Sequence, residues 1–328
     1  MKYKVLFLAM SCRDKFFSDQ IEKVKQTWAK DIIDGKYGEN VEFLSYDGWE
    51  KDFKLDRENH VLHCKCEDDG LNTFKKTYYA LKTIQENFDY DFIFRTNTST
   101  FVNVPLVLKF IEGLDPNSEV VWASEILSLV EAPVPYPLDL YGRGNGLILS
   151  RAAIKALIHE GIDVLYYELC DDVAIGNVLN SYHIKKGEDY KDYLKSFTHG
   201  WFRVVDTKNF SNHHKLCEYW NDNEDYDFLK HFMTIQVKQY YHREDEEENY
   251  EKVYSIFKDK SDDEIDVTIK RIYEYSKNPN VFIGSILGYI DLDIYNRLDM
   301  NYLWDEQCNH KAINDENRDK FYPGKVWY

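Results

Sequence analysis

The sequence predicts an α/β fold, and three observations indicate it. Apolar runs at 5–10 and 92–94 are short and continuous, which is typical of strands covered on both faces of a sheet, and VEFLSY at 41–46 is interpreted as a further strand. The stretches between them carry apolar residues at helical spacing, so strands and helices alternate. The chain has 328 residues, of which 44% are hydrophobic, and is long enough to bury a sizeable core.

Two amphipathic helices are predicted in the first half of the chain. In the stretches 16–30 and 71–88, apolar residues recur at steps of three, four or seven, so they share one helical face. They are Phe17, Ile21, Val24 and Trp28 in the first stretch, and Leu71, Phe74, Tyr78, Leu81 and Phe88 in the second. Pro105 follows the strand predicted at 92–96 and suits the first turn of a further helix.

The middle of the chain continues this alternation. A strand is predicted at 120–124, and the stretch 131–146, which holds three prolines and three glycines, is predicted to be a long loop. Ser150 is placed to cap a following helix through its side chain. The stretch 170–182 predicts a helix that begins at two aspartates and turns its apolar residues inward. These are Val173, Val178, Leu179 and Tyr182.

Charge and cysteine usage exclude several classes of protein. The formal charge is −17, so nucleic acid is not expected as a partner, because a polyanion needs a basic face. The apolar run at 5–10 is too short for a signal-peptide core or a spanning helix, which predicts a soluble, cytoplasmic protein. Reduced thiols are therefore expected, and Cys64 and Cys66 are interpreted as strand residues on one face.

An acidic run at 242–252 indicates a domain boundary or the solvated face of a helix. We expect a first domain over 1–242 and a smaller C-terminal accessory region over 243–328. The later region is predicted to form short strands and turns. Two roles are considered for it, binding of a substrate and dimerisation.

Three polar constellations could carry chemistry. They are the segment 68–83, the segment 96–103, and the pair formed by 141–150 and 170–176. Each also has a plain structural interpretation. The segment 68–83 could be a turn before a helix, and 96–103 a loop of small residues. The segment 141–150 could be a flexible glycine loop, and the aspartates of 170–176 could cap a helix and interact with its dipole.

The order and spacing of these segments resemble the inverting β-1,3-glycosyltransferases and Fringe proteins. NTFKKT at 72–77 is similar to the family's "N-L-x-x-K-T", and FIFRTNTSTFVN at 92–103 to its metal-binding strand. YGRGNGLILS at 141–150 is similar to the acceptor loop, and DDVAIG at 171–176 to "D-D-V-x-x-G". KVKQTWAKD near the start also looks like the family's "I-R-x-T-W" helix. The resemblance covers roughly residues 1–185 and implies a GT-A type, nucleotide-sugar-binding Rossmann-like domain with a mixed central sheet.

The resemblance implies catalytic and acceptor residues. Transfer with inversion needs a base to deprotonate the acceptor hydroxyl, and the resemblance assigns this role to Asp172, with Asp171 its neighbour and competitor. Two adjacent acids can raise the pKa of one of them. The acceptor-binding residues implied are Tyr141, Gly144, Asn145 and Gly146.

The donor site departs from the family pattern at its metal motif. Asn97 and Ser99 stand where the family has two metal-binding aspartates, and neutral side chains bind a hard divalent cation weakly. Cationic side chains would then have to stabilise the departing diphosphate in place of a metal. The donor-binding residues considered are Arg13, Lys76, Arg95, Asn97, Ser99, His213, His214 and Lys215.

The sequence therefore predicts a metal-independent, inverting glycosyltransferase of polysaccharide biosynthesis, either soluble or peripheral to a membrane-bound glycan assembly site. Its expected partners are a nucleotide-sugar donor, expected to be UDP-linked, and a glycan or glycoprotein acceptor. A homo-oligomer formed through 243–328 is also considered. No obligatory cofactor is expected. One alternative is a transferase that holds Mn²⁺ or Mg²⁺ through other carboxylates, such as Asp68 and Asp69 or Asp171 and Asp172. Another is a non-catalytic protein that binds glycans or nucleotide sugars.

Overall fold

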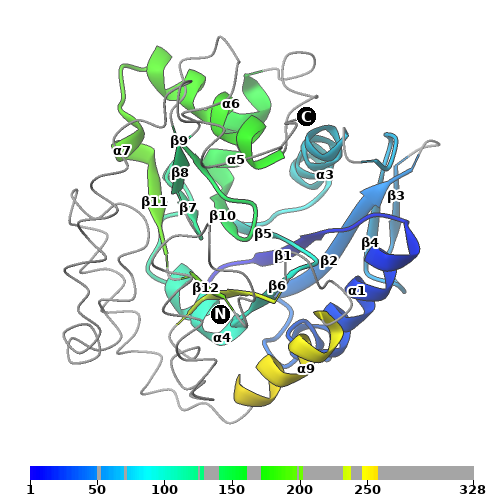
Figure 1. The fold of residues 1–328 in the computed structure, drawn as a ribbon. Helices are drawn as coiled ribbons and strands as arrows, with labels where there is room; N and C mark the ends of the chain where they lie inside the picture. Colours follow the sequence, from blue (N-terminus) through cyan, green and yellow to red (C-terminus); the bar gives the residue numbers. More distant parts are fainter. Residues whose placement is uncertain are drawn as a thin grey trace, which may run out of the picture.

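The computed structural model describes residues 1–49, 53–69, 72–124, 126–128, 140–160, 171–197, 199–201, 232–237 and 246–257. A large sheet with strand order β11-β7-β10-β5-β1-β2-β4-β3 forms its centre (Figure 1). Its strands are β1 (Val5–Met10), β2 (Val41–Gly48), β3 (Lys54–Asp56), β4 (Val61–Cys64), β5 (Phe92–Asn97), β7 (Val121–Ala123), β10 (Leu147–Ser150) and β11 (Leu194–Ser196).

Parallel and antiparallel pairs occur together in this sheet. β1 pairs in parallel with both β2 and β5, whereas β10 runs antiparallel to β5 and to β7. The predicted α/β class with a mixed central sheet is thereby confirmed. The described helices are α1 (Lys15–Gln26), α2 (Lys30–Ile33), α3 (Thr73–Asn87), α4 (Val104–Ile111), α5 (Arg151–His159), α6 (Asp171–Lys185), α7 (Tyr190–Tyr193) and α9 (Glu246–Phe257).

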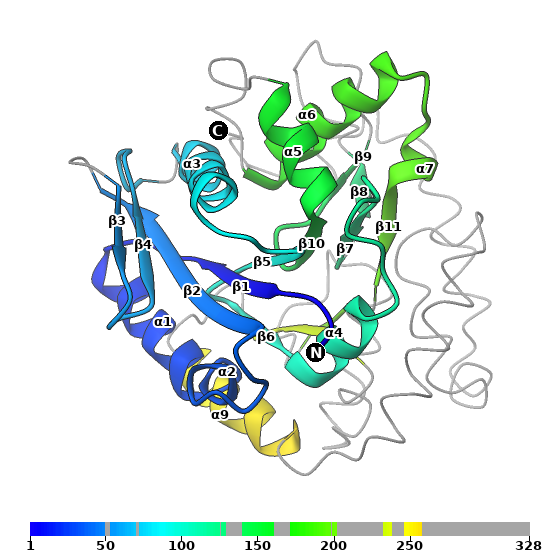
Figure 2. The ribbon, with the colours of Figure 1, turned by 180° about the vertical axis from the view of Figure 1, so that it is seen from behind.

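Helices cover both faces of the sheet, as the continuous apolar strands predict (Figures 1 and 2). Side chains alternate along β1, so that Val5 and Phe7 belong to one buried cluster, and Leu6 and Leu8 to the other. The first cluster is completed by α1, α2, α4 and α9, and the second by α3, α5 and α6.

The predicted helix signals are largely confirmed. Ser150 caps α5 by accepting a hydrogen bond from the backbone N–H of Ala153, and Pro105 lies in the first turn of α4. The first helix is shorter than predicted and ends at Gln26, although Trp28 still reaches the core with an exposed fraction of 3%. None of the described helices is both long and apolar enough to cross a membrane.

The described cysteines, Cys12, Cys64 and Cys66, form no disulfide with one another. Cys64 ends β4, whereas Cys66 lies just past the strand, and both side chains are buried, while Cys12 is half-buried. The long loop predicted at 131–146 is partly a strand, because β9 (Leu140–Gly142) pairs with β8 (Ile126–Ser128). Residues 131–139 lie outside the described residues.

A second, smaller sheet brings later segments of the predicted domain 1–242 against its N-terminal part. β13 (Thr234–Gln236) pairs with β6 (Thr100–Val102) and with β12 (His199–Trp201). α9 follows the predicted boundary at 243, yet it lies alongside α1 (Figures 1 and 2) and buries Tyr250 and Val253 in the first cluster. The division into 1–242 and 243–328 stays a prediction for the chain beyond residue 257, which lies outside the described residues.

Candidate functional site

The carboxyl ends of parallel strands gather the polar residues at one edge of the large sheet. Met10, the last residue of β1, is paired with Tyr46 of β2 and with Asn97 of β5. The chain leaves β1 for β2 on one side and returns to β5 on the other. Ligands of open α/β sheets bind at such a reversal of strand order, so this edge is the candidate site.

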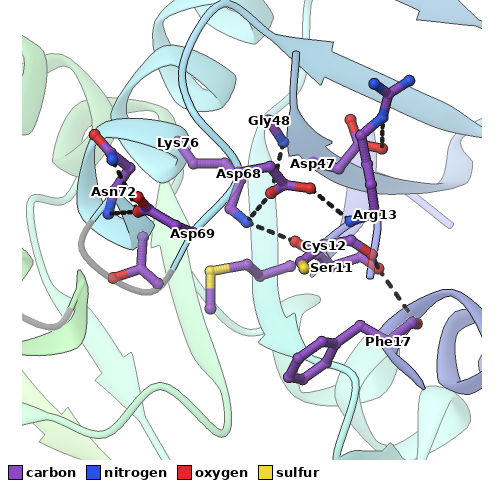
Figure 3. Close-up of polar contacts among 12 residues, drawn as sticks. Ser11, Cys12, Arg13, Phe17, Asp47, Gly48, Asp68, Asp69, Asn72 and Lys76 are labelled. Atoms are coloured by element: carbon purple, nitrogen blue, oxygen red, sulfur yellow. Dashed lines mark hydrogen bonds and ion pairs between the residues drawn. The ribbon is translucent and has the colours of Figure 1, made fainter. Parts of the chain in front are cut away.

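The carboxylate of Asp68 ties several segments of this edge together (Figure 3). Its Oδ1 accepts hydrogen bonds from Lys76 Nζ at 2.7 Å and from the Gly48 N–H at 3.0 Å, and its Oδ2 accepts from the Arg13 N–H at 2.5 Å. Lys76 also donates to the Ser11 carbonyl at 2.7 Å and is only 2% exposed. Lys76, predicted to bind the donor, is therefore placed where it supports the loop after β1 from inside the protein.

Gly48 has to be a glycine at this point of the network. A Cβ on Gly48 would lie 2.7 Å from Cβ of Asp68, closer than two such atoms approach in proteins. The close approach lets the Gly48 N–H reach the Asp68 carboxylate.

Arg13 is the candidate cation that faces outward. Its guanidinium lies over the ring of Trp49, 3.5 Å from the centroid, and its Nε is 3.6 Å from Oδ2 of Asp47. Asp47 Oδ1 is 2.6 Å from Nδ1 of His63, while burial raises the pKa of the Asp47 carboxyl against the effect of that histidine. The Arg13 side chain is 44% exposed. Arg13 can thus meet an anion from solvent, and Trp49, Asp47 and His63 are neighbours that the sequence interpretation missed.

Arg95 takes a different place from the one predicted. It is fully buried, donates to the Asp171 carboxylate, and donates through Nε to the Tyr46 hydroxyl at 3.2 Å and through Nη1 to the Gly144 carbonyl at 2.8 Å. Each guanidinium nitrogen thus has a partner within the protein. This geometry corrects the interpretation of Arg95 as a diphosphate-binding cation, because the guanidinium is already used to neutralise Asp171.

The two adjacent aspartates at the start of α6 have different surroundings. Asp171 is 6% exposed and accepts from Arg95 and from Thr77 Oγ1, the latter at 3.2 Å. Asp172 is half-buried and accepts from two backbone N–H groups, Gly144 at 3.1 Å and Val173 at 2.8 Å. Burial, and next the charge of Asp171, raise the pKa of Asp172 above its ordinary value. Asp171 is thus tied to a cation, while Asp172 has the environment of a proton acceptor.

The turn from Asn97 to Thr100 is closed on itself. Oδ1 of Asn97 accepts from the Ser99 N–H at 3.0 Å, from Ser99 Oγ at 3.1 Å and from Thr100 Oγ1 at 2.9 Å. Three donors pointing at a neutral amide oxygen do not suit a divalent cation, which needs anionic or uncommitted oxygens. Asn97 and Ser99 therefore do not fit the metal that the family pattern implies at this position.

The alternative carboxylates are also committed to the protein. Asp68 forms an ion pair with Lys76, and Asp171 forms an ion pair with Arg95. Asp69 Oδ1 accepts from both the backbone and the side-chain nitrogen of Asn72, each at 2.8 Å.

One three-ligand group of the kind that binds metals is found among the described residues, at Glu119, His183 and Glu188. Lys186 donates to Glu119 and is 3.3 Å from Glu188, so an ammonium group already neutralises these carboxylates.

The predicted acceptor loop packs directly on the aspartates. Asn97 Nδ2 donates to the Gly144 carbonyl at 3.2 Å, and Thr96 Oγ1 donates to the Asn145 carbonyl at 2.9 Å. A Cβ on Gly144 would lie 2.6 Å from Nη1 of Arg95, so no larger residue fits without movement. Tyr141 lies half-buried in β9, and Gly146 accepts a backbone hydrogen bond from Ser124 at 2.8 Å. The structure thus brings this loop to Asp172, as the sequence order predicts.

The last predicted donor residues, His213, His214 and Lys215, lie outside the described residues.

Comparison with known proteins gives weak structural likenesses only. No family model matches the chain, and no curated protein matches it. Among solved structures, a glycosyltransferase involved in the glycosylation of the major capsid of PBCV-1 aligns at 8% identity, over 76% of this chain and 98% of that chain, with a TM-score of 0.40. The galactosyltransferase LgtC, in complex with donor and acceptor sugar analogs, aligns at 12% identity over 79% of this chain and 98% of that chain, with a TM-score of 0.39. The glycosyltransferase GlyE of Streptococcus pneumoniae TIGR4 aligns at 12% identity over 84% of this chain and 64% of that chain, with a TM-score of 0.34.

These three aligned proteins are glycosyltransferases, and each of the three TM-scores is below 0.5.

Proposed function

We propose that the chain is a glycosyltransferase that moves a sugar from a nucleotide-sugar donor to a hydroxyl group of a glycan or glycoprotein acceptor. The observation that carries this proposal is the pair of adjacent aspartates at the start of α6. One is neutralised by a buried arginine, and the other is held by backbone N–H groups with a raised pKa. Pairs of acids whose environments differ in this way are typical of general acid–base sites.

In the proposed reaction, Asp172 acts as the general base. Its carboxylate takes the proton of the acceptor hydroxyl while that oxygen attacks the anomeric carbon of the donor sugar. The bond from that carbon to the diphosphate breaks, and its electron pair leaves with the nucleoside diphosphate. Attack from the face opposite the leaving group inverts the anomeric centre. The resemblance of the sequence motifs supports inversion and a β-1,3 linkage.

Arg13 is the proposed partner of the leaving diphosphate. Its exposed guanidinium lies at the carboxyl end of β1, at the switch point where open α/β sheets bind nucleotides. Trp49, beneath that guanidinium, offers an aromatic surface next to it. Charge-assisted hydrogen bonds from arginine to phosphate are among the stronger polar contacts, so one such residue contributes measurably to binding.

The transfer is proposed to proceed without a divalent metal. The support is the donor set around Asn97, whose amide oxygen already accepts three hydrogen bonds. A uridine-linked donor is proposed from the motif resemblance alone. The neutral residues at 97 and 99 also favour a second candidate, a non-catalytic protein that binds nucleotide sugars without transferring the sugar.

The first experiment measures thermal unfolding with UDP, GDP or CMP, each with EDTA and with added manganese. A ligand at about one hundred times its Kd stabilises the native state by about 2.7 kcal/mol, which gives a readily measured shift. Stabilisation by UDP that survives EDTA supports the metal-independent donor site. A shift that requires manganese contradicts it, and no shift with any nucleotide contradicts the proposed function.

The second experiment separates transfer from binding. Wild type and Asp172→Asn are compared for release of the nucleoside diphosphate from a panel of UDP-sugars in the presence of glycan acceptors. A transferase releases the diphosphate only in the wild type, while both bind the nucleotide. Binding without release by the wild type favours the non-catalytic candidate.

A further inference from the structure

Helix α9 contacts the back of the candidate site, although it lies about 150 residues further along the chain than the turn it touches. The hydroxyl of Tyr250 donates to the carbonyl of Thr98 at 2.7 Å and also approaches the carbonyl of Thr100 at 3.1 Å. Tyr250 is fully buried, and both carbonyls belong to the turn that carries Asn97 and Ser99. One side chain thus holds both arms of that turn.

A neighbouring residue of α9 holds the same turn indirectly. Asn249, also fully buried, donates to the Val237 carbonyl at 3.1 Å, and the Val237 N–H donates to the Ser99 carbonyl at 3.0 Å. The helix itself is attached to α1, where Lys23 pairs with Glu251 at 2.8 Å. The turn is therefore attached to the N-terminal core through α9.

A continuous series of hydrogen bonds runs from this turn to the proposed base. Asn97 Nδ2 donates to the Gly144 carbonyl at 3.2 Å, and the Gly144 N–H donates to Asp172 Oδ2 at 3.1 Å. Arg95 donates to the same Gly144 carbonyl at 2.8 Å. The position of Gly144, and with it one of the two backbone N–H bonds to Asp172, depends on where the turn is held.

We propose that Tyr250 is a positioning residue of this site, which fixes the 97–100 turn and, through Asn97 and Gly144, the Asp172 carboxylate. The inference deepens the proposed function, since the importance of Asp172 rests on it. It also makes residues beyond the predicted domain boundary at 243 part of the catalytic unit.

The test compares Tyr250→Phe with Tyr254→Phe in the full-length chain. Both substitutions remove one hydroxyl group from α9 and keep the aromatic ring, whose packing includes Phe101, 6.4 Å from Tyr250 between ring centroids. Tyr254 is half-buried against the same core cluster and lies one turn further along the helix. It is therefore a matched control.

The first readout, amide hydrogen–deuterium exchange of segments 97–103, 140–147 and 5–10, needs no substrate. Loss of the Tyr250 hydroxyl is expected to speed exchange at 97–103 and 140–147 by about two- to tenfold relative to 5–10, the range for one hydrogen bond. Tyr254→Phe should leave these ratios unchanged. Equal acceleration of all three segments, or no change at 140–147, overturns the proposal.

The second readout is the pH dependence of donor turnover. The groups described around Asp172 that carry charge or titrate are Asp171 of α6, Arg95 of β5 and Tyr46 of β2 behind that arginine. The Gly144 hydrogen bond lowers the pKa of Asp172, so weakening it in Tyr250→Phe should move the acid limb of kcat to higher pH. The KM of the donor should stay unchanged. A fall in kcat with the same acid limb means that Tyr250 acts only on stability, which overturns the positioning role.

The two readouts distinguish this inference from the proposed function. If the wild type neither binds nucleotides nor transfers sugar, the proposed function falls, while the exchange ratios still decide whether Tyr250 holds the turn and the glycine loop.

Discussion

The substitution Asp171→Asn should strongly destabilise the protein, because it leaves a buried charge without its partner. The guanidinium of Arg95 has no exposed surface, and Asp171 is 6% exposed, so water cannot replace the missing carboxylate. Removing one member of a buried ion pair costs about 3–5 kcal/mol. A typical domain is stable by only about 5–15 kcal/mol, so this loss is a large part of the total.

The assay is the urea concentration at the midpoint of unfolding, with Asp19→Asn as the matched control. Asp19 pairs with Lys15 at 2.6 Å on the surface, where its side chain is 49% exposed, and its loss should leave the midpoint unchanged. The double substitution Arg95→Met with Asp171→Leu should recover part of the loss, because no unpaired charge remains. An Asp171→Asn protein that unfolds at the wild-type midpoint would refute the buried ion pair and the assignment of separate roles to the two aspartates.

Four further predictions concern the site. Asp172→Asn should lower kcat by about 10²–10⁴-fold with nucleotide binding retained. In the wild type, the rate should fall as the pH drops through the pKa of Asp172, which lies above that of an ordinary aspartate, because the base must be deprotonated. Steady-state kinetics of the wild type and of Asp172→Asn over a range of pH checks both predictions. Gly144→Ala would place a Cβ 2.6 Å from Nη1 of Arg95 and should destabilise the protein by about 1–3 kcal/mol in urea unfolding, with reduced turnover. Arg13→Gln should weaken UDP binding roughly 10- to 100-fold in calorimetric titration, because a charged contact to phosphate is lost. The control Lys15→Gln removes an exposed cation two residues away and should leave the UDP affinity unchanged. Equal UDP affinities of Arg13→Gln and the wild type would exclude Arg13 from the donor site.

The sequence indicated the fold class and the strands at the centre of the sheet well, since these depend on local signals. Continuous apolar runs predicted β1 and β5, the stretch VEFLSY predicted β2, and the cap at Ser150 predicted the start of α5. The sequence did not predict that α9 packs against α1 and the first buried cluster. An acidic run indicates which face of a helix is solvated, but it does not indicate which core the apolar face packs against. Tyr250 carries no local mark of its contact with a turn 150 residues earlier.

The site shows the same division between local and long-range information. Motif order placed Asp171, Asp172 and the glycine loop together, and the structure does bring Gly144 to Asp172. Motif order also predicted that Arg95 binds the donor. The sequence does not distinguish a cationic side chain that faces a ligand from one that faces a buried carboxylate.

By itself, the sequence determined the α/β alternation, the start of α6 at two aspartates and the neutral residues at 97 and 99, because each of these depends on residue types and their spacing. Only the tertiary structure decided which charges are neutralised inside the protein and which face outward. Arg95 and Lys76 are enclosed with carboxylates from other segments, whereas Arg13 stays exposed. Burial and pairing arise from contacts between distant parts of the chain, and they set which of these groups can meet a ligand.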